Sequence, residues 1–556
     1  MQLSRHGQDG MGISMSDWWR GAAVYQIYPR SFQDDNGDGI GDLAGITRRL
    51  DHVASLGVEA IWLSPIFTSP MDDMGYDVSN YTDIDPLFGT LKDFDVLVAR
   101  AHALGLKVII DQVLSHTSDR HPWFAESRAD KTNPKADWYV WADPRPDGTP
   151  PNNWPSHFGG PAWEWDTRRR QYYLHNFLIS QPDLNFHQPA VQDALLDTMT
   201  FWLERGVDGF RLDTVNYYFC DAKLRSNPPM AQKDGRPSVN PYDMQDHIYS
   251  KTQPENIGFL QRMRRLLDAY DARAMVGEVG EANRALAVME EYTRGRDRLH
   301  MAYSFEMLGP QFTAGHFRKL IEGFFAGAPD GWPWWSFSNH DVNRHASRWA
   351  KHGASHEALA RLAIAMMIGF EGTIGLYQGE ELGQTETELS YDELTDPPGL
   401  KFWPENKGRD GCRTPMAWQA AAPNAGFSTA SRPWLPVKPE QAARAVDGQE
   451  ADPHSILAAY RAALAFRRAE PALRHGKTRF AEVAEPVLAF HRLHEGRAVT
   501  CLYNLSPRAV SLAMQGPAEP IGPAAAVERS GDRLHLGPNG FAFFASPAEA
   551  LPHLGA

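Results

Sequence analysis

The feature that most constrains the fold is a repeated alternation of short apolar runs with longer amphipathic stretches. Eight apolar runs, rich in β-branched and aromatic residues, lie at 24–28, 58–63, 107–110, 209–212, 275–277, 301–305, 334–338 and 373–377. Apolar residues recur at helical spacing between them, for example at 46–56, 91–104, 190–205 and 256–270. Strands that are buried on both faces are continuous apolar runs, and their alternation with helices indicates βαβ units. Eight such units predict an α/β fold, a closed (β/α)8 TIM barrel.

Two segments interrupt the alternation. The stretch 112–206 separates the third and fourth apolar runs and includes six of the seventeen tryptophans between residues 123 and 165, which predicts a small lobe at the barrel rim. An irregular segment at 384–440 follows the eighth run, and we expect it to fold over the same face. After a helix near 455–468, short alternating runs predict an antiparallel β domain; they lie at 487–493, 498–505, 509–513 and 540–545.

These patterns divide the chain into four parts. We expect an N-terminal extension at 1–17, a barrel at 18–112 and 184–474, an inserted domain at 113–183 and a C-terminal β domain at 475–556.

Composition excludes several classes of protein. With 42% hydrophobic residues the chain can bury a large core, and with a net charge of −14 it has no basic surplus to bind nucleic acid or an anionic membrane. The three cysteines, Cys220, Cys412 and Cys501, are too few and too far apart for a disulfide framework or a CxxC metal site. Neither a secretory signal nor an apolar run of about 18 residues is present, so we expect a cytoplasmic protein.

Polar side chains follow the ends of several predicted strands, where active sites of such barrels lie. Three carboxylates, two histidines and an arginine should therefore meet at one rim: Asp213, Glu278, Asp341, His116, His340 and Arg211, with Asp111 at the end of the third strand. Crowded carboxylates raise one another's pKa, an arrangement typical of catalytic sites. A pair of carboxylates without a nucleotide loop or redox cofactor favours glycoside hydrolysis.

Seven motifs carry a resemblance to a known family. They are GVEAIWLSPIFTSP (57–70), IIDQVLSHT (109–117), QPDLNF (181–186), GFRLDTVN (209–216), GEVG (277–280), FSNHD (337–341) and GRDGCRTPMAW (408–418). In this order the sequence resembles glycoside hydrolase family 13, the α-amylase family, in its oligo-1,6-glucosidase/α-glucosidase branch. The resemblance implies a (β/α)8 barrel, an inserted domain B after the third strand and a C-terminal antiparallel β-sandwich.

The resemblance also implies roles for individual residues. Asp213 would be the nucleophile, Glu278 the acid/base and Asp341 the carboxylate that holds sugar hydroxyls, with Arg211 keeping Asp213 ionised. Other residues would bind the glucose in the pocket: Tyr76, His116, Phe177, Gln181 and His340. Asp73 would pair with Arg409, or less readily Arg413, to close the pocket behind the non-reducing end, which implies exo-action on small substrates.

Two residues depart from the family pattern. Ser115 stands where most members have an asparagine that reaches calcium in many α-amylases, so we expect no calcium there. Thr214 follows the predicted nucleophile in place of the valine of the α-1,6-specific members, which points toward α-1,4 bonds.

A possible metal loop, DDNGDGIGD, follows the first predicted strand at 34–42. Side-chain oxygens of Asp34, Asn36, Asp38 and Asp42, with the Ile40 carbonyl, follow the alternate spacing of an EF-hand loop. Gly45 occupies the position of the bidentate glutamate, so the site must differ from an EF-hand. The resemblance implies a structural Ca²⁺, or Mg²⁺, and the alternative is an Asx-rich turn without metal; no organic cofactor is expected.

The sequence thus predicts a retaining exo-α-glucosidase that acts on short α-glucosides, prefers maltose-like α-1,4 linkages, extends to sucrose and transfers glucose as a side activity. The alternative is a sucrose isomerase, trehalose synthase or transglucosylase of the same fold, which shares the three carboxylates. A catalytically inactive relative of transporter heavy chains is disfavoured because all three carboxylates are present. We expect a small-molecule substrate and a monomer or homodimer.

Overall fold

The computed structural model describes residues 17–230 and 238–555, so all but the last residue of the expected N-terminal extension lies outside the described residues. The eight predicted barrel strands are confirmed and form one parallel sheet: β1 (Ala23–Ile27), β2 (Ala60–Leu63), β5 (Lys107–Gln112), β9 (Gly209–Leu212), β10 (Ala274–Val279), β11 (Met301–Ser304), β12 (Trp334–Ser336) and β13 (Thr373–Tyr377). The sheet order is β11-β10-β9-β5-β2-β1-β13-β12. A parallel bridge between Ala302 and Pro333 joins the two ends of this order and closes the barrel.

A helix follows each barrel strand, as the amphipathic stretches predict. These helices are α1 (Leu43–Ser55), α2 (Leu91–Ala103), α4 (Pro189–Glu204), α5 (Asn256–Leu267), α6 (Ala285–Thr293), α7 (Ala314–Gly327), α9 (His356–Gly369) and α14 (Ile456–Ala469). Side-chain caps fix several of their starts: Asp42 accepts from the Gly45 N–H in α1, and Thr90 and Asp93 form a capping box in α2. No helix of the described residues is both long and apolar enough to cross a membrane.

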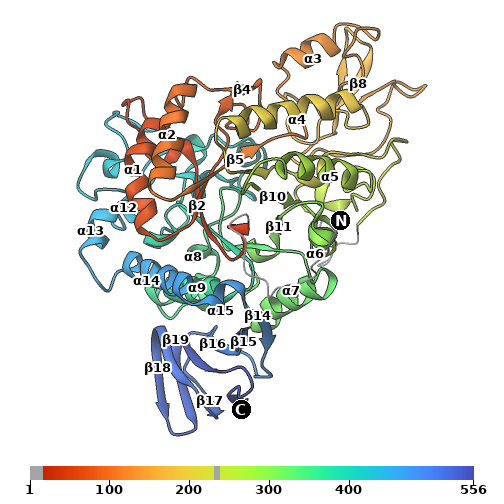
Figure 1. Cartoon of the computed structure of the whole chain (residues 1–556). Coiled ribbons are helices and arrows are strands. Elements are labelled where there is room, and N and C mark those ends of the chain that lie inside the picture. The colour runs from red at the N-terminus through yellow and green to blue at the C-terminus, as the bar shows by residue number, and fades with distance from the viewer. Residues whose placement is uncertain (1–16, 231–237, 556) are drawn as a thin grey trace, which may run out of the picture.

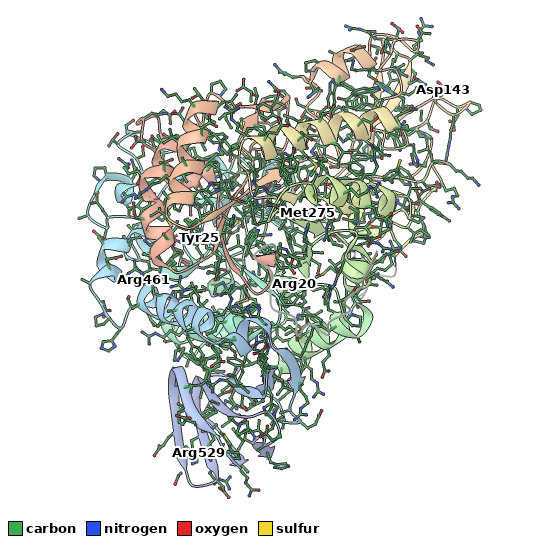
Figure 2. All side chains as sticks on the ribbon, viewed as in Figure 1. Arg20, Tyr25, Asp143, Met275, Arg461 and Arg529 are labelled. Atoms are coloured by element: carbon green, nitrogen blue, oxygen red, sulfur yellow. The ribbon has the colours of Figure 1, made fainter. Side chains whose placement is uncertain are left out.

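The insertion between β5 and α4 projects from the barrel and forms the upper right of Figure 1. It contains α3 (Pro122–Ser127) and a three-stranded sheet made of β6 (Trp141–Ala142), β8 (Gln171–Leu174) and β7 (Trp163–Asp166). Trp154 and Trp163 are buried in a small cluster that the insertion shares with Cys220, as a structural role for the tryptophans predicts. Figure 2 places Asp143 at the outer side of this lobe, away from Tyr25 and Met275 in the barrel strands. A separate two-stranded sheet, β3 (Phe67–Thr68) and β4 (Asn80–Ile84), lies between β2 and α2 in the chain.

The irregular segment after β13 is a series of short helices. They are α10 (Pro397–Phe402), α11 (Asp410–Arg413), α12 (Pro439–Ala442) and α13 (Val446–Glu450). Two more short helices, α8 (His345–Arg348) and α15 (Pro471–His475), follow β12 and α14. Arg409, at the start of α11, contacts Asp73, so this part of the segment lies at the barrel rim.

The C-terminal domain is antiparallel and lies at the opposite end of the molecule from the insertion (Figure 1). Its strands are β14 (Lys477–Phe480), β15 (Val487–His494), β16 (Arg497–Asn504), β17 (Val510–Gln515), β18 (Glu519–Ser530), β19 (Arg533–Pro547) and β20 (His553–Gly555). The four predicted strands are present, whereas β14, β18 and β20 were not predicted. Two prolines in β18, Pro520 and Pro523, argue against a strand, but β18 is recorded pairing with β19 alone among the described strands, and an edge position tolerates proline.

Candidate active site

The carboxyl ends of the barrel strands converge on one cavity of about 750 Å³, a volume typical of ligand sites. Ten of its lining residues matter here: Asp73, Tyr76, His116, Phe158, Phe177, Asp213, Thr214, Glu278, Asp341 and Arg409. Arg211, Gln181 and His340 are fully buried and contact this lining from behind. The residues that the sequence predicts for the sugar pocket are therefore brought together at one place.

Arg211, on β9, holds the two predicted catalytic carboxylates at once. Its guanidinium lies 2.6 Å from an oxygen of Asp213 and 2.6 Å from an oxygen of Glu278. It also contacts Asp111 at 2.8 Å and the Tyr303 hydroxyl at 2.8 Å. A planar guanidinium presents several donors in a fixed fork, so this one side chain orients both carboxylates.

Asp213 and Glu278 share one electrostatic environment. Burial raises the pKa of Glu278 to about 7, and the neighbouring charges of Asp213 and Asp341 add to this rise while Arg211 opposes it. Burial also raises the pKa of Asp213, again against Arg211. Because ionisation of either carboxylate disfavours ionisation of the other, the two titrate as a pair, and one proton on the pair is the favoured state near neutral pH.

Asp341 differs from this pair because cations surround it. Burial disfavours its charged form, but the guanidinium groups of Arg409 and Arg413 outweigh burial and lower its pKa. Burial lowers the pKa of the adjacent His340, so that ring is neutral near pH 7 and adds no positive charge. Arg413 donates to Asp341 at 3.1 Å, and Arg409 lies 3.3 Å from the same oxygen. Asp341 is thus ionised and can accept hydrogen bonds from hydroxyl groups in the cavity.

An ion pair closes one side of the cavity. Arg409 contacts Asp73 at 2.9 Å, and Gln181 donates to the second oxygen of Asp73 at 3.1 Å. Between the two candidate partners of Asp73, Arg409 makes the contact, whereas Arg413 contacts Asp341.

Aromatic and imidazole rings form the remaining wall. The Tyr76 ring stacks on His340 with centroids 5.3 Å apart, and the Tyr76 hydroxyl hydrogen-bonds that histidine. Phe177 packs against His116 with centroids 5.2 Å apart. Burial lowers the pKa of His116 to about 4, so this ring is neutral near pH 7.

Thr214 connects Asp213, which precedes it in the chain, to Glu278. Its backbone is left-handed, with φ 41° and ψ 47°, which is rare for a β-branched residue. In this conformation its N–H donates to Glu278 Oε2 at 3.1 Å, and its hydroxyl lies 3.0 Å from that of Ser115. The two residues that depart from the family pattern therefore contact each other.

The predicted metal loop forms a compact turn next to α1. Asp34 accepts the N–H groups of Gly37 and Gly39 at 2.7 and 2.8 Å, and Asp42 Oδ2 accepts the Asp35 N–H at 2.9 Å. Asn36 and Asp38 are exposed, and each caps the backbone two residues on. The described part of the chain has no cluster of three His, Cys, Asp or Glu side chains arranged for a metal. The donor types, oxygen atoms from residues 34, 36, 38, 40 and 42, nevertheless suit a hard cation.

Two buried residues of the site were missed from the sequence. Asp396 contacts Arg409 at 2.6 Å, but it lies in the irregular segment where no strand pattern draws attention to it. Tyr303 donates to Glu278 at 3.0 Å and lies in β11. The signal for Tyr303 is its position as a polar residue near the carboxyl end of the sixth predicted strand, 301–305.

Comparisons with known proteins agree with this geometry. Residues 26–476 match the family described as alpha amylase, catalytic domain. The chain is 58% identical over 500 residues to a probable α-glucosidase of Rhizobium meliloti (strain 1021), covering 89% of this chain and 90% of the relative. It is 37% identical over 539 residues to an oligo-1,6-glucosidase of Heyndrickxia coagulans, covering 89% and 94%. The crystal structure of the α-glucosyl transfer enzyme XgtA superposes with a TM-score of 0.92 at 52% identity, covering 95% of this chain and 99% of that one.

Proposed function

Since the chain belongs to the alpha-amylase family, we propose that it is a retaining, exo-acting α-glucosidase that releases α-glucose from the non-reducing end of short α-glucosides. The observation that carries the proposal is the shared guanidinium of Arg211, which lies 2.6 Å from both Asp213 and Glu278 beside a sugar-sized cavity. Glycoside hydrolysis uses two such carboxyl groups in different protonation states.

In the first step, an Asp213 oxygen forms a bond to the anomeric carbon while the bond from that carbon to the leaving oxygen breaks. Glu278 gives its proton to the leaving oxygen. In the second step, a water molecule gives a proton to Glu278. The water oxygen forms a bond to the anomeric carbon while the bond from that carbon to Asp213 breaks. Two displacements at one carbon retain the α configuration.

The protein's own groups prepare these steps. Burial and neighbouring carboxylates raise the pKa of both Asp213 and Glu278, while Arg211 opposes the rise at both, so the pair can hold one proton near neutral pH. The proposed reaction uses that proton on Glu278. Asp341, ionised between Arg409 and Arg413, would accept sugar hydroxyls. The Asp73–Arg409 pair would block longer chains behind the non-reducing end, which supports exo-action.

The test is the identity of the first product. An NMR time course with methyl α-glucoside, whose leaving group is not glucose, should show α-glucose before mutarotation. Asp213→Asn and Glu278→Gln should each lower the rate by several orders of magnitude. Asp193→Asn, at the exposed end of the Asp193–Arg262 ion pair, is the matched control and should keep the wild-type rate. β-Glucose as the first product would refute the proposal.

A second candidate is a dedicated glucosyl transferase. It is favoured by the 52% identity to a protein described as an α-glucosyl transfer enzyme. In that case a sugar hydroxyl, instead of water, would attack the intermediate on Asp213. Product analysis at high sucrose concentration separates the two. Transfer releases fructose but no glucose, so a transferase would form new oligosaccharides in excess over free glucose, whereas hydrolysis releases glucose and fructose in equal amounts.

We also propose four further properties of the protein: its linkage preference, a structural cation, its location and its oligomeric state. Thr214 lines the cavity next to the nucleophile, which supports a preference for α-1,4 bonds. The oxygen ligands of residues 34–42 would hold a structural Ca²⁺, or Mg²⁺, remote from the chemistry. The three cysteines are free and buried, which fits a reducing, cytoplasmic environment. We propose a monomer or a homodimer, and size-exclusion chromatography would distinguish the two.

A further inference from the structure

A chain of hydroxyl groups connects the neutral histidine of the pocket to the nucleophile. The Ser115 hydroxyl lies 2.9 Å from His116 Nδ1 and 3.0 Å from Thr214 Oγ1. Thr214 Oγ1 lies a further 3.3 Å from Asp213 Oδ2. Each hydroxyl has one proton to donate, so the direction of the chain decides whether Asp213 receives a hydrogen bond from it.

The direction is set at His116. Its Nε2 lies 2.9 Å from the Tyr76 carbonyl, which can only accept, so Nε2 must carry the proton. Gln181 Nε2 lies 3.2 Å from the same ring nitrogen, but both of its protons have other acceptors, Asp73 at 3.1 Å and Tyr76 at 3.2 Å. The Leu178 N–H donates to Gln181 Oε1, which fixes the orientation of the amide. A neutral His116 therefore has an unprotonated Nδ1.

The remaining protons follow from that assignment. Because His116 Nδ1 can only accept, Ser115 donates its single proton to it. The Ser115 oxygen then accepts a hydrogen bond from the Thr214 hydroxyl at 3.0 Å. Because this hydroxyl has a single proton, it cannot also donate to Asp213 Oδ2, which lies 3.3 Å away. Arg211 holds the other oxygen of Asp213, Oδ1, at 2.6 Å.

We infer that Ser115 is a positioning residue that draws the Thr214 hydroxyl proton away from Asp213, leaving Oδ2 free to attack. A hydrogen bond to Oδ2 would stabilise the carboxylate before the reaction and would have to break as the oxygen bonds to carbon. The inference rests on the proposed function, since it assumes that Asp213 is the nucleophile.

The test is a double-mutant cycle of Ser115→Ala and Thr214→Val. Threonine and valine are both β-branched, so the left-handed backbone at residue 214 is equally strained in both backgrounds. With Ser115→Ala alone, the Thr214 proton turns to Asp213 Oδ2. In the Thr214→Val background residue 214 has no hydroxyl proton that could turn to Asp213 Oδ2. Any effect that Ser115→Ala exerts through His116 is the same in both backgrounds, so it cancels when the two effects of Ser115→Ala are subtracted.

We expect Ser115→Ala to lower kcat/KM about 10-fold more in the wild-type background than in the Thr214→Val background, the size of a hydrogen bond to a charged group. The acid limb of the kcat/KM profile should move to lower pH by about one unit in the wild-type background only, because a bond to the ionised form lowers a pKa. The other titratable groups around Asp213 are unchanged in these variants: Arg211, Asp111, Glu278, Asp341, Tyr76, Tyr218 and Tyr303.

Equal penalties in the two backgrounds, or an acid limb that does not move, would overturn the inference. A crystal structure of Ser115→Ala gives a second measurement: the Thr214–Asp213 distance should shorten from 3.3 Å to about 2.8 Å, and an unchanged distance counts against it. If Ser115→Ala does not fold, Ser115→Cys, with a weakly accepting thiol, replaces it in the same cycle.

Two further variants separate the causes of failure. Ser127→Ala removes a buried serine hydroxyl that bonds Ala136 in the insertion and should leave the pH profile unchanged. Asp213→Asn reports on the proposed function itself. If it stays active, the nucleophile is wrongly assigned; if it is inactive and the cycle shows no coupling, only the role of Ser115 is wrong.

Discussion

Removal of the Arg409 side chain should affect both the stability and the activity of the protein, because this residue contacts three carboxylates of the pocket. Its guanidinium contacts Asp73 at 2.9 Å, Asp396 at 2.6 Å and Asp341 at 3.3 Å, and all three carboxylates are at most 18% exposed. Asp341 keeps Arg413 in the Arg409→Ala variant, whereas Asp73 loses its only ion-pair partner among the described residues. Removing one member of a buried pair costs about 3–5 kcal/mol, because a buried charge remains without compensation.

The loss of folding stability in Arg409→Ala should increase as the pH rises. Burial raises the pKa of Asp73 and Arg409 opposes the rise, so the pKa rises further in the variant. A carboxyl group whose pKa is higher in the folded than in the unfolded state destabilises the fold as the pH rises from the unfolded value, about 3.9, through the folded value. Arg409→Ala should therefore lower the melting temperature more at pH 7.5 than at pH 5.

The assay compares melting temperatures at these two pH values with kcat/KM for maltose and maltotetraose. We expect kcat/KM for maltose to fall about 100-fold, with a smaller fall for maltotetraose because the closed end is opened. Arg409→Lys should recover part of the stability, but not the fork geometry. Arg461→Ala, which breaks an exposed pair with Glu450, is the control and should cost at most about 1 kcal/mol. Equal melting losses at both pH values, or unchanged maltose kinetics, would refute the reasoning.

Three other predictions concern the substrate and the metal loop. Soluble starch should be nearly inert, since the Asp73–Arg409 pair blocks the cavity; a rapid fall in viscosity would contradict this. Asp38→Ala should abolish any rise in melting temperature with added calcium and leave kcat at 25 °C nearly unchanged; identical wild-type melting curves with calcium and with chelator would instead support a turn without metal. Thr214→Val should shift the kcat/KM ratio of maltose to isomaltose toward isomaltose by about 10-fold or more, because the Thr214 oxygen can accept a hydroxyl of the second sugar and a methyl group cannot. An unchanged ratio would place linkage choice elsewhere.

Much of the fold follows from local pattern, because each barrel strand is an apolar run that must be buried on both faces. All eight predicted strands overlap the observed ones, and the caps at Asp42 and Thr90 use residue types that favour helix starts. The edge strand β18 escaped prediction because its prolines are tolerated only when its place in the sheet is known.

The site was predictable in part for a similar reason. Strand ends locate Asp213 and Glu278, since parallel strands bring their carboxyl ends to one rim. The position of Asp396 depends on how an irregular segment crosses that rim, and no periodicity encodes such a path. Proton directions are also non-local: the donor role of Ser115 is decided through the His116 ring by the carbonyl of Tyr76, which lies 40 residues before His116 in the chain.

The backbone conformation of Thr214 links the contacts around Asp213, Glu278 and Ser115. A left-handed conformation costs a non-glycine residue about 1–3 kcal/mol and persists only where the surroundings impose it. Here it directs the Thr214 N–H to Glu278 and the hydroxyl to Ser115, while Asp213 directly precedes it in the chain. Relaxing residue 214 toward an extended backbone would therefore displace the contacts with Glu278 and Ser115 and shift Asp213, the proposed nucleophile. Because the contacts with Glu278 and Ser115 both depend on this left-handed backbone, we infer that the strain at residue 214 is retained for the geometry of the site.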